Sequence, residues 1–591
     1  MDIIKLADRY MHHEFNVLGS GWKRCFYGMS GNGFEGKNYF SQYSRKQAVD
    51  DIPEFYRKKA EHFISMLPDG YEPVDWQIDL RSGARFTAST HHSKIAYGVT
   101  DGVDAKVSAD LGRLYQLPVL ARAYRKSKKS CYKKEMLNQL YDFMAFNAPE
   151  YGAAWRANMN VAIRAANIIF ALEIAGVKIK GELLDFISEH DKYIYNNLEY
   201  PENHYHPNLF ISNLAALLMT SIVCRNRTHY DYAVENLDRQ ILWQSNAEGT
   251  NFENATSYHF FVLEMLATPI IYAAQKENMT PDQWIKTKFS AAAVERLEKI
   301  CSTAAALCDE TGHSPIIGDN DSGRFAILEN PVAAAGNWNF LFKLCNQLFP
   351  DKKFSTGSSD SAAFPEAGYF ILRQGQKNML FFTCGPIGTN GKGGHAHNDK
   401  LAFTLRLDGR NIFTDPGIYI YTASSYYRKL FRSTSVHNTL QIKEYEQNRS
   451  GENPWWGMFD DTACVCTEFT ENSVAGKHSG FLRFPDGAEH TRNIDWQGNT
   501  IKITDTISKK CDGVKLNFML NEDVEMVEFS AQKIKLRSKN VLITMTSNQG
   551  KWHTEGAFIA HSYGTKTYTQ KLVLEWENAC DSSSVTINYT I

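Results

Sequence analysis

The chain changes its hydrophobic period near the middle. From about residue 100 to 310, apolar residues recur at steps of three and four, the spacing of amphipathic or buried helices. Short polar turns separate the apolar segments, as in antiparallel helix pairs. The clearest segments are 106–127, 159–176, 207–226 and 257–278. We therefore expect a helical domain made of paired helices packed in two layers.

After about residue 365 the hydrophobic period becomes two. Segments of four to eight residues alternate or run apolar, and turn signals separate them, as expected for strands. These segments lie within 367–386, 400–417, 499–507 and 571–578. Asp408-Gly409 is a strong signal for a two-residue hairpin turn. The second part of the chain is therefore expected to form an antiparallel sandwich.

The chain length predicts more than one domain, because 591 residues exceed what one hydrophobic core accommodates. Helices followed by strands indicate two separate domains. We place the helical domain at 101–355 and the β-sandwich at 365–591, with the Ser-, Gly- and Ala-rich segment "FSTGSSDSAAFPEAG" as linker. Residues 1–100 are less regular and are expected to cap the helical domain.

Composition and charge narrow the possible partners and compartments. The formal net charge is −2, so no global basic field predicts nucleic acid binding, and a polyanionic substrate would need a local basic cleft. The N-terminus lacks the apolar core of a secretory signal, and no segment is long enough for a membrane span. Eleven scattered cysteines without a CxxC pair predict reduced thiols. We expect a cytoplasmic protein, or a periplasmic one if a leader was removed; the oligomeric state stays open.

Two helical stretches carry side chains suited to chemistry. In "PENHYHPNLF", Asn203 and His204 precede a long apolar helix, and a cap or turn role explains Asn203 equally well. In "NAEGTNFENATSYHFF", Glu253 and Tyr258 lie at another helix start. Tyr258 shares a helical face with apolar residues, so packing in the core is the simpler interpretation of that residue alone.

A third helical-domain stretch, "SPIIGDNDSGRF", places Asp319, Asp321 and Arg324 in a glycine-bounded loop. By itself this pattern predicts only a turn stabilised by side-chain hydrogen bonds.

In the strand-rich part, "GGHAHNDK" alternates His395, His397 and Asp399. On an extended chain these three side chains share one face. A metal site, a catalytic base or a satisfied polar strand end would each produce this pattern. The residue types alone do not decide between them.

The metal hypothesis gains two further ligand types downstream, Asp415 and His437, since His and Asp both bind zinc. A regular hairpin turning at Asp408-Gly409 would place Asp415 on the opposite face from His397. The strand must therefore bend if both residues are to hold one ion. We expect the bend at the glycine pair before His395 or at Pro416-Gly417.

Five of these motifs together resemble the heparinase II/III-like polysaccharide lyases, whose relatives include alginate and other uronate-polymer lyases. They occur in family order across roughly residues 70–445. The motifs are "NHYHPN", "EGTNFENATSYH", "IGDNDSGR", "GGHAHNDKLAFTLRLDGRNIFTDPG" and "RKLFRSTSVHNT". The resemblance implies an incomplete (α/α) toroid followed by an antiparallel β-sandwich, with the catalytic cleft between them.

The resemblance also implies residue roles. Asn203 and His204 would contact the uronate carboxylate, Tyr258 would be the catalytic tyrosine, and His395 would be the second catalytic group. A zinc ion, structural rather than chemical in relatives, is implied as cofactor. Its ligands correspond to His397, Asp415 and His437.

Four residues are expected to contact the anionic, uronate-containing poly- or oligosaccharide. They are Trp155, Arg156, Glu253 and Tyr427. Trp155 could stack on a sugar and Arg156 could meet a carboxylate, although helix packing would explain both. The family's further active-site tyrosine corresponds to Tyr421, Tyr426 or Tyr427.

The implied reaction is β-elimination, which removes the C5 proton of a uronate and expels the oxygen at C4. It needs donors that stabilise the charge developing on the carboxylate, a base for the proton and an acid for the leaving oxygen. Tyr258 can serve as both base and acid if both groups leave from one face of the sugar. If they leave from opposite faces, His395 is the better base and Tyr258 the acid.

Three other functions fit parts of the sequence. A glycoside hydrolase would use two carboxylates, and a non-catalytic sugar-binding or assembly factor of a surface-polysaccharide pathway would use the same scaffold. A metallo-hydrolase of the β-lactamase type would continue the HxHxD motif with another histidine, where this chain has Lys400. The carboxylates available to a hydrolase are Glu248, Glu253, Asp319 and Asp321.

Overall fold

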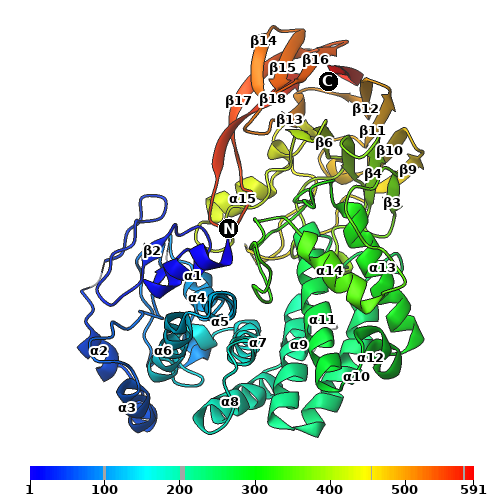
Figure 1. The fold of residues 1–591 in the computed structure, drawn as a ribbon. Coiled ribbons are helices and arrows are strands. Elements are labelled where there is room, and N and C mark those ends of the chain that lie inside the picture. Colours follow the sequence, from blue (N-terminus) through cyan, green and yellow to red (C-terminus); the bar gives the residue numbers. More distant parts are fainter. Residues whose placement is uncertain (41, 97–100, 200–206, 454, 577–578) are drawn as a thin grey trace.

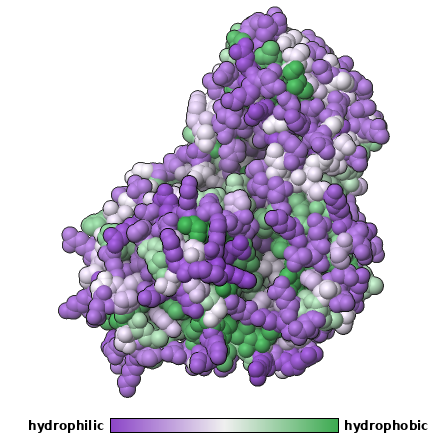
Figure 2. All heavy atoms as spheres, in the orientation of Figure 1, coloured by the Kyte–Doolittle hydropathy of each residue, from purple (hydrophilic) through white to green (hydrophobic). Residues whose placement is uncertain are grey.

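The structure is a computed structural model of the 591-residue chain, and it describes every residue except 41, 97–100, 200–206, 454 and 577–578. Helices form one half of the molecule and sheets form the other, and the two halves meet at a narrower waist (Figure 1). Hydrophilic side chains cover most of the face seen in that view (Figure 2).

The helical half is an incomplete (α/α) toroid, as predicted, in which the helices follow one another around an arc (Figure 1). Its elements are α1 Ile3–Met11, α2 Arg45–Asp50, α3 Arg57–Ser65, α4 Ala105–Leu111, α5 Gln116–Ser127, α6 Ser130–Phe146, α7 Asn158–Ile174, α8 Glu182–Asn196, α9 Asn208–Cys224, α10 Arg227–Trp243, α11 Thr256–Lys276, α12 Pro281–Lys288, α13 Ala291–Leu307 and α14 Asn339–Leu348. Helix α9 contacts α7, α8, α10 and α11, which explains why its sequence is apolar on nearly all sides.

Among the described residues, the sheet half contains antiparallel strands and one α-helix, α15 Ser425–Arg432. A small pair, β1 Glu14–Phe15 and β2 Lys23–Arg24, lies in the N-terminal region. The other strands are β3 Ala362–Phe364, β4 Tyr369–Arg373, β5 Met379–Thr383, β6 Phe403–Leu407, β7 Arg410–Phe413, β8 Leu440–Ile442, β9 Val465–Phe469, β10 Ser473–His478, β11 His490–Gln497, β12 Thr500–Cys511, β13 Val514–Met519, β14 Glu525–Phe529, β15 Lys533–Ser538, β16 Val541–Ser547, β17 Lys551–Ile559, β18 Thr567–Glu575 and β19 Cys580–Thr590. They form sheets in the orders β3-β4-β5-β6-β7, β17-β18-β13-β8 and β14-β15-β16-β19-β12-β11-β10-β9.

The sheet β3-β4-β5-β6-β7 connects the two halves because both of its faces are buried. On β4 and β5, Ile371 and Phe381 belong to the core of the helical half, whereas Leu372 and Leu380 belong to the core of the sandwich. Side chains alternate between the two faces of a strand. Both strands are consequently buried throughout, and they are apolar except for Arg373 and Thr383 at their ends. The sheet presents the following connection, residues 384–402, to the helices.

The hairpin β6–β7 turns at Asp408-Gly409 as predicted, with positive φ angles of 43° and 74°. The pairing shifts by one residue between Leu405 and Arg406, so Leu405 faces Phe413 instead of Ile412. This β-bulge changes which face the downstream residues occupy. The bulge lies within the hairpin, and the positive φ angles of Gly393 (53°) and Gly417 (64°) show that the chain also leaves the extended conformation at both glycine-containing sites expected from sequence.

All eleven cysteines are free in this structure. Among the described residues, no helix is both long enough and apolar enough to cross a membrane.

Candidate active site

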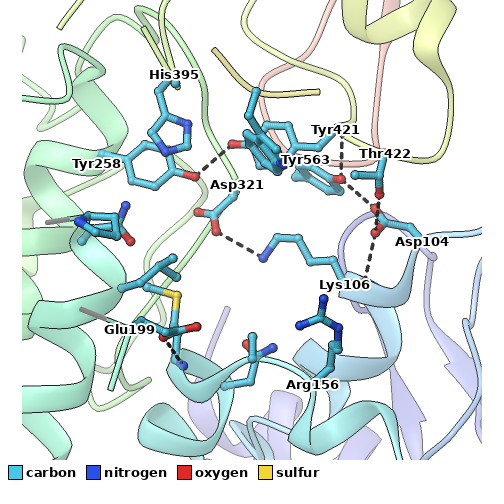
Figure 3. Close-up of a pocket in the computed structure, with 18 of the residues that line it drawn as sticks. Asp104, Lys106, Arg156, Glu199, Tyr258, Asp321, His395, Tyr421, Thr422 and Tyr563 are labelled. Atoms are coloured by element: carbon cyan, nitrogen blue, oxygen red, sulfur yellow. Dashed lines mark hydrogen bonds and ion pairs between the residues drawn. The ribbon is translucent and has the colours of Figure 1, made fainter. Parts of the chain in front are cut away.

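A cavity of about 490 Å³ lies between the two halves of the molecule. Its volume falls within the range of about 300–1,000 Å³ typical of small-molecule sites. Figure 3 shows side chains from both halves around one open space. The residues used below that line it are Asp104, Lys106, Arg113, Arg156, Glu199, Tyr258, Asp321, His395, Tyr421, Thr422, Trp456 and Tyr563.

Tyr258 enters the cavity from the first turn of α11. Its hydroxyl lies 3.1 Å from the hydroxyl of Tyr421, which comes from the sheet half. Burial raises the pKa of the Tyr258 phenol well above its usual value, and the carboxylates of Asp321 and Asp319 act in the same direction. In this structure Tyr258 is therefore a neutral phenol.

His395 lies in the 384–402 connection, and its ring stacks on that of Tyr258 with 3.9 Å between centroids and 19° between planes. Its Nδ1 is 2.9 Å from Asp319 Oδ2, and its Nε2 is 3.1 Å from Glu253 Oε2. Burial opposes protonation, but these two carboxylates outweigh it and raise the pKa of His395 to about 9. His395 therefore donates from both ring nitrogens.

Asp319 connects the catalytic candidates to the metal candidates. Its carboxylate also accepts hydrogen bonds from both terminal nitrogens of Arg428, one at 2.8 Å, and from His397 Nε2 at 3.1 Å. Its backbone N–H donates to the carbonyl of His395 at 3.0 Å. This close approach requires glycine at position 318, because a Cβ there would lie 2.7 Å from that carbonyl oxygen.

Glu253 contacts His395 on the side away from the cavity and holds its ring in place. It is fully buried, and its carboxylate accepts a hydrogen bond from the backbone N–H of Asn208, the first residue of α9, at 2.8 Å. A carboxylate is favourable at a helix N-terminus. Glu253 therefore joins the start of α9 to His395.

The three predicted metal ligands, His397, Asp415 and His437, come together with their ligand atoms within 4.8 Å of one another. His437 Nδ1 donates to the carbonyl of Ser433 at 2.7 Å, and His397 Nε2 donates to Asp319. The remaining nitrogens, His397 Nδ1 and His437 Nε2, therefore carry lone pairs and face each other at 3.3 Å. Asp415 Oδ2 lies 3.6 Å from His437 Nε2. This donor set fits a zinc ion, whose histidine ligands usually donate their other nitrogen to an outer acceptor.

Charges of both signs line the cavity. Lys106 Nζ lies 3.2 Å from Asp321 and 3.1 Å from Asp110. Arg113 and Arg156 add two guanidinium groups, while Asp104 and Glu199 add carboxylates. The cavity is therefore not uniformly basic. Its lysine and arginine side chains provide positive charge only locally.

Comparison with known families decides what these motifs represent. A family model described as heparinase II/III N-terminus matches residues 38–332, and one described as heparinase II/III-like, C-terminal, matches residues 356–588. The chain belongs to the heparinase II/III-like family. Both halves of the molecule, and every candidate residue discussed above, fall within the matched ranges.

The individual relatives and related structures share little sequence identity with this chain. A heparin-sulfate lyase of Pedobacter heparinus is 24% identical over 236 residues, which cover 37% of this chain and 33% of that protein. The match thus spans about a third of the length of this curated relative. The crystal structure of heparinase III has 17% identity and a TM-score of 0.67, covering 91% of this chain and 85% of that one. A Streptomyces coelicolor chondroitin AC lyase has 10% identity and a TM-score of 0.52, covering 93% and 80%. These structural likenesses show the fold.

Within this heparinase II/III-like structure, Tyr258, His395 and Arg156 line the cavity as expected. Asn203 and His204, predicted to contact the uronate carboxylate, lie outside the described residues.

Three of the predicted substrate contacts are not among the described residues that line the cavity. Trp155 is fully buried and packs against Tyr193 and the guanidinium of Arg164, so the helix-packing alternative holds. Glu253 is buried behind His395 rather than exposed to the cavity. Tyr427 lies on α15, where its hydroxyl donates to Glu35 at 3.0 Å.

Of the three tyrosines left open by sequence, Tyr421 lines the cavity, whereas Tyr426 and Tyr427 are not among its described lining residues.

Arg428 and Trp456 are among the site residues that sequence reasoning missed. Arg428 is fully buried on Asp319, and Trp456 projects its ring toward His395 and Tyr421, with centroid distances of 6.0 and 5.0 Å. Arg428 Nε also donates to the carbonyl of Trp455 at 3.0 Å, which fixes the Trp456 segment. The adjacent tryptophans in "NPWWG" were the available sequence signal for this wall.

Proposed function

We propose that this protein is a polysaccharide lyase that cleaves uronate-containing glycans by β-elimination. The observation that carries the proposal is the meeting of Tyr258 and His395, from separate halves of the chain, in one cavity with stacked rings. Membership of the heparinase II/III-like family supports the reaction class.

Tyr258 is the proposed proton carrier. The phenol must first lose its proton to solvent. The resulting phenolate takes the C5 proton and then returns that proton to the leaving C4 oxygen, so the phenolate is regenerated. His395 donates both ring N–H groups to carboxylates, so it offers no lone pair to a C5 proton in this arrangement. The stacked imidazolium instead stabilises negative charge on Tyr258. We therefore favour Tyr258 as both base and acid, with proton removal and departure of O4 on one face of the sugar.

The negative charge that develops on the uronate carboxylate needs a partner. Among the described residues, Arg156 and Lys106 are positioned in the cavity to supply positive charge. Asn203 and His204 stay proposed donors on the resemblance alone. Each well-placed donor would contribute about 3 kcal/mol, the size of oxyanion-hole effects in other enzymes.

We also propose that His397, Asp415 and His437 hold a structural zinc ion. When bound, the ion would join the 384–402 connection to the segments that follow β7 and α15. Asp319 then has two tasks, because it orients His397 through one carboxylate oxygen and His395 through the other. The metal site would thereby fix the loop that presents His395 without touching the sugar.

The substrate class follows from the relatives. Their names specify heparin sulfate and chondroitin sulfate, both of which are uronate-containing glycosaminoglycans. We propose an anionic glycan of this chemistry as substrate. The glycoside hydrolase alternative finds less support, since only Asp321 of its four proposed carboxylates is among the described lining residues.

The test is a screen of heparan sulfate, chondroitin sulfate and alginate, as polymers and tetrasaccharides, following the ultraviolet absorbance of the new double bond. We expect absorbance with at least one glycan, and its loss in Tyr258→Phe and His395→Ala. Tyr272→Phe is the matched control, because Tyr272 is a buried tyrosine on the same helix that bonds Glu173 away from the cavity.

New reducing ends without absorbance would identify a hydrolase instead. Binding without turnover across the whole panel would indicate the non-catalytic sugar-binding factor. Metal analysis of the wild type and of His397→Ala tests the zinc proposal separately.

A further inference from the structure

One end of the cavity is closed where the helical and sheet halves touch. Asp104, the N-cap residue of α4, accepts hydrogen bonds from Tyr563 Oη at 2.7 Å and from Thr422 Oγ1 at 3.2 Å. Arg81 Nη2 supports the same carboxylate from behind at 3.2 Å. Figure 3 shows the contacts of Asp104 with Tyr563 and Thr422 at the edge of the cavity. We call Asp104, Thr422 and Tyr563 the cleft wall.

A second set of contacts reinforces the cleft wall from outside the cavity. Glu35, from the N-terminal region, accepts hydrogen bonds from Tyr419 Oη at 2.7 Å and Tyr427 Oη at 3.0 Å, and it pairs with Lys566 Nζ at 2.8 Å. Lys566 Nζ also lies 3.7 Å from the ring centre of Tyr427. One carboxylate of the helical half thus holds three groups of the sheet half. We call this set the Glu35 clasp.

Hydrophobic packing fills the space between the cleft wall and the clasp. Phe34 stacks on Tyr419 at 5.5 Å and belongs to a buried cluster that also contains Tyr421 and Tyr563. The backbones of Gly19 and Gly564 touch, since a Cβ on Gly19 would lie 2.5 Å from Gly564. The closure is therefore a packed core rather than a single bridge of side chains.

The reacting groups lie close to this closure. Tyr421 connects the cleft wall to Tyr258. Its backbone N–H donates to Tyr563 Oη at 2.9 Å, and its hydroxyl is 3.1 Å from that of Tyr258. Only one tyrosine separates the proposed proton carrier from the cleft wall. The contacts among the described residues close this side of the cavity, so a glycan bound at Tyr258 would end against it.

We propose that the cleft wall and the Glu35 clasp make this cavity a pocket for chain ends, so the protein acts on glycan termini and short oligosaccharides rather than within long chains. This inference rests on the proposed lyase function. It adds the cleavage mode and the substrate size, which neither the motifs nor the relatives' names specify.

The test separates the inference from the function on which it rests. The wild-type protein is incubated with heparan sulfate, chondroitin sulfate and alginate polymers, and products are sized by chromatography at low conversion. We expect one short unsaturated product while the polymer peak hardly shifts. A broad ladder of intermediate sizes with ultraviolet absorbance would overturn chain-end binding but keep the lyase function. No absorbance with any polymer or tetrasaccharide would overturn the lyase function itself.

A variant pair tests the closure directly. Glu35→Ala removes the clasp, and Glu528→Ala is the matched control, because Glu528 pairs with Lys535 on the β14–β15 edge of the sandwich. We expect a severalfold rise in intermediate-sized products with Glu35→Ala alone, and unchanged tetrasaccharide turnover in both variants. An unaltered product pattern in Glu35→Ala and in Glu35→Ala combined with Tyr563→Phe would overturn the cleft wall as the stop.

Discussion

Two buried clusters in this protein combine the same residue types in different surroundings. Each has an aspartate that accepts hydrogen bonds from an arginine and a histidine, with a second histidine nearby. The first cluster borders the cavity, and the second lies inside the sandwich. The first consists of Asp319, Arg428, His395 and His397, and the second of Asp505, Arg492, His490 and His478.

The clusters differ in how the chain assembles them. Arg492 and Asp505 face each other in the register of β11 and β12, so a local strand pairing brings them together. Asp319 lies in the loop between α13 and α14, and it meets His395 and Arg428 from 76 and 109 residues away. The first cluster therefore exists only when both halves of the molecule are folded together.

The clusters also differ in access and in charge. His395 borders the cavity and faces two carboxylates, and its pKa rises to about 9. His490 is fully buried and shares Asp505 with Arg492, and burial lowers its pKa. The comparison teaches that a His–Asp–Arg set is not in itself a catalytic signature. An open face and a second carboxylate distinguish the proposed catalytic cluster from the cluster inside the sandwich.

The largest expected effect separates the two histidines by activity. His395→Gln should reduce lyase turnover by about 10²–10³-fold, the size of electrostatic charge-stabilising effects in other enzymes, while His490→Gln should keep the turnover of each folded molecule. The rate of absorbance increase, normalised to folded protein by circular dichroism, measures both. Equal losses of turnover in the two variants would contradict the assignment of a catalytic role to the Asp319 cluster alone.

Removing the aspartates should affect stability similarly. Asp319→Ala and Asp505→Ala each leave a buried arginine without its partner, which costs about 3–5 kcal/mol. Urea unfolding of both variants measures the change in the free energy of unfolding. If only one variant is destabilised, the two carboxylates do not contribute equally to the stability of the fold.

Zinc binding should respond to one aspartate only. Asp319→Asn should weaken zinc affinity by about 10–100-fold, because Asp319 fixes the ring orientation of His397, whereas Asp505→Asn should leave the affinity unchanged. Competition with a chelator measures both affinities. A wild-type protein that binds no zinc would contradict the metal proposal.

The smallest effect concerns the aromatic ring beside each cluster. Trp456→Ala should raise KM by a few-fold to tenfold, since an aromatic contact contributes about 0.5–1.5 kcal/mol, with little loss of stability. Phe481 packs on His478 in the sandwich core, and Phe481→Ala should instead cost about 3–5 kcal/mol of stability with KM unchanged. Steady-state kinetics and thermal unfolding distinguish the two outcomes.

The sequence predicted the parts of the molecule that depend on local pattern. Hydrophobic periods located the helices and the strands, and Asp408-Gly409 located a hairpin turn. One predicted helical segment, 106–127, is interrupted between α4 and α5, where Leu114 has a φ of 58°. The family motifs found Tyr258 and His395, which line one cavity. They also found the three metal candidates that lie together.

Features set by distant contacts were not predictable from pattern. The glycine-bounded loop around Asp319 indicated an ordinary turn, because its partners lie far away in sequence. Sequence predicts Tyr427 as a sugar contact, but on α15 its hydroxyl donates to Glu35. Trp155 fitted a stacking role by residue type, and only the packed helices show that it is enclosed. The bulge in β6–β7 likewise depends on pairing that single residues do not reveal.

The sheet β3-β4-β5-β6-β7, buried on both faces, has a practical consequence. The Ser- and Gly-rich segment before it looks like a convenient place to divide the gene. A cut there would strip the toroid of its apolar cover and leave Ile371 and Phe381 facing water on the other fragment. Neither fragment should stay soluble alone, so exchanging domains with a relative would require the replacement toroid to match this shared sheet.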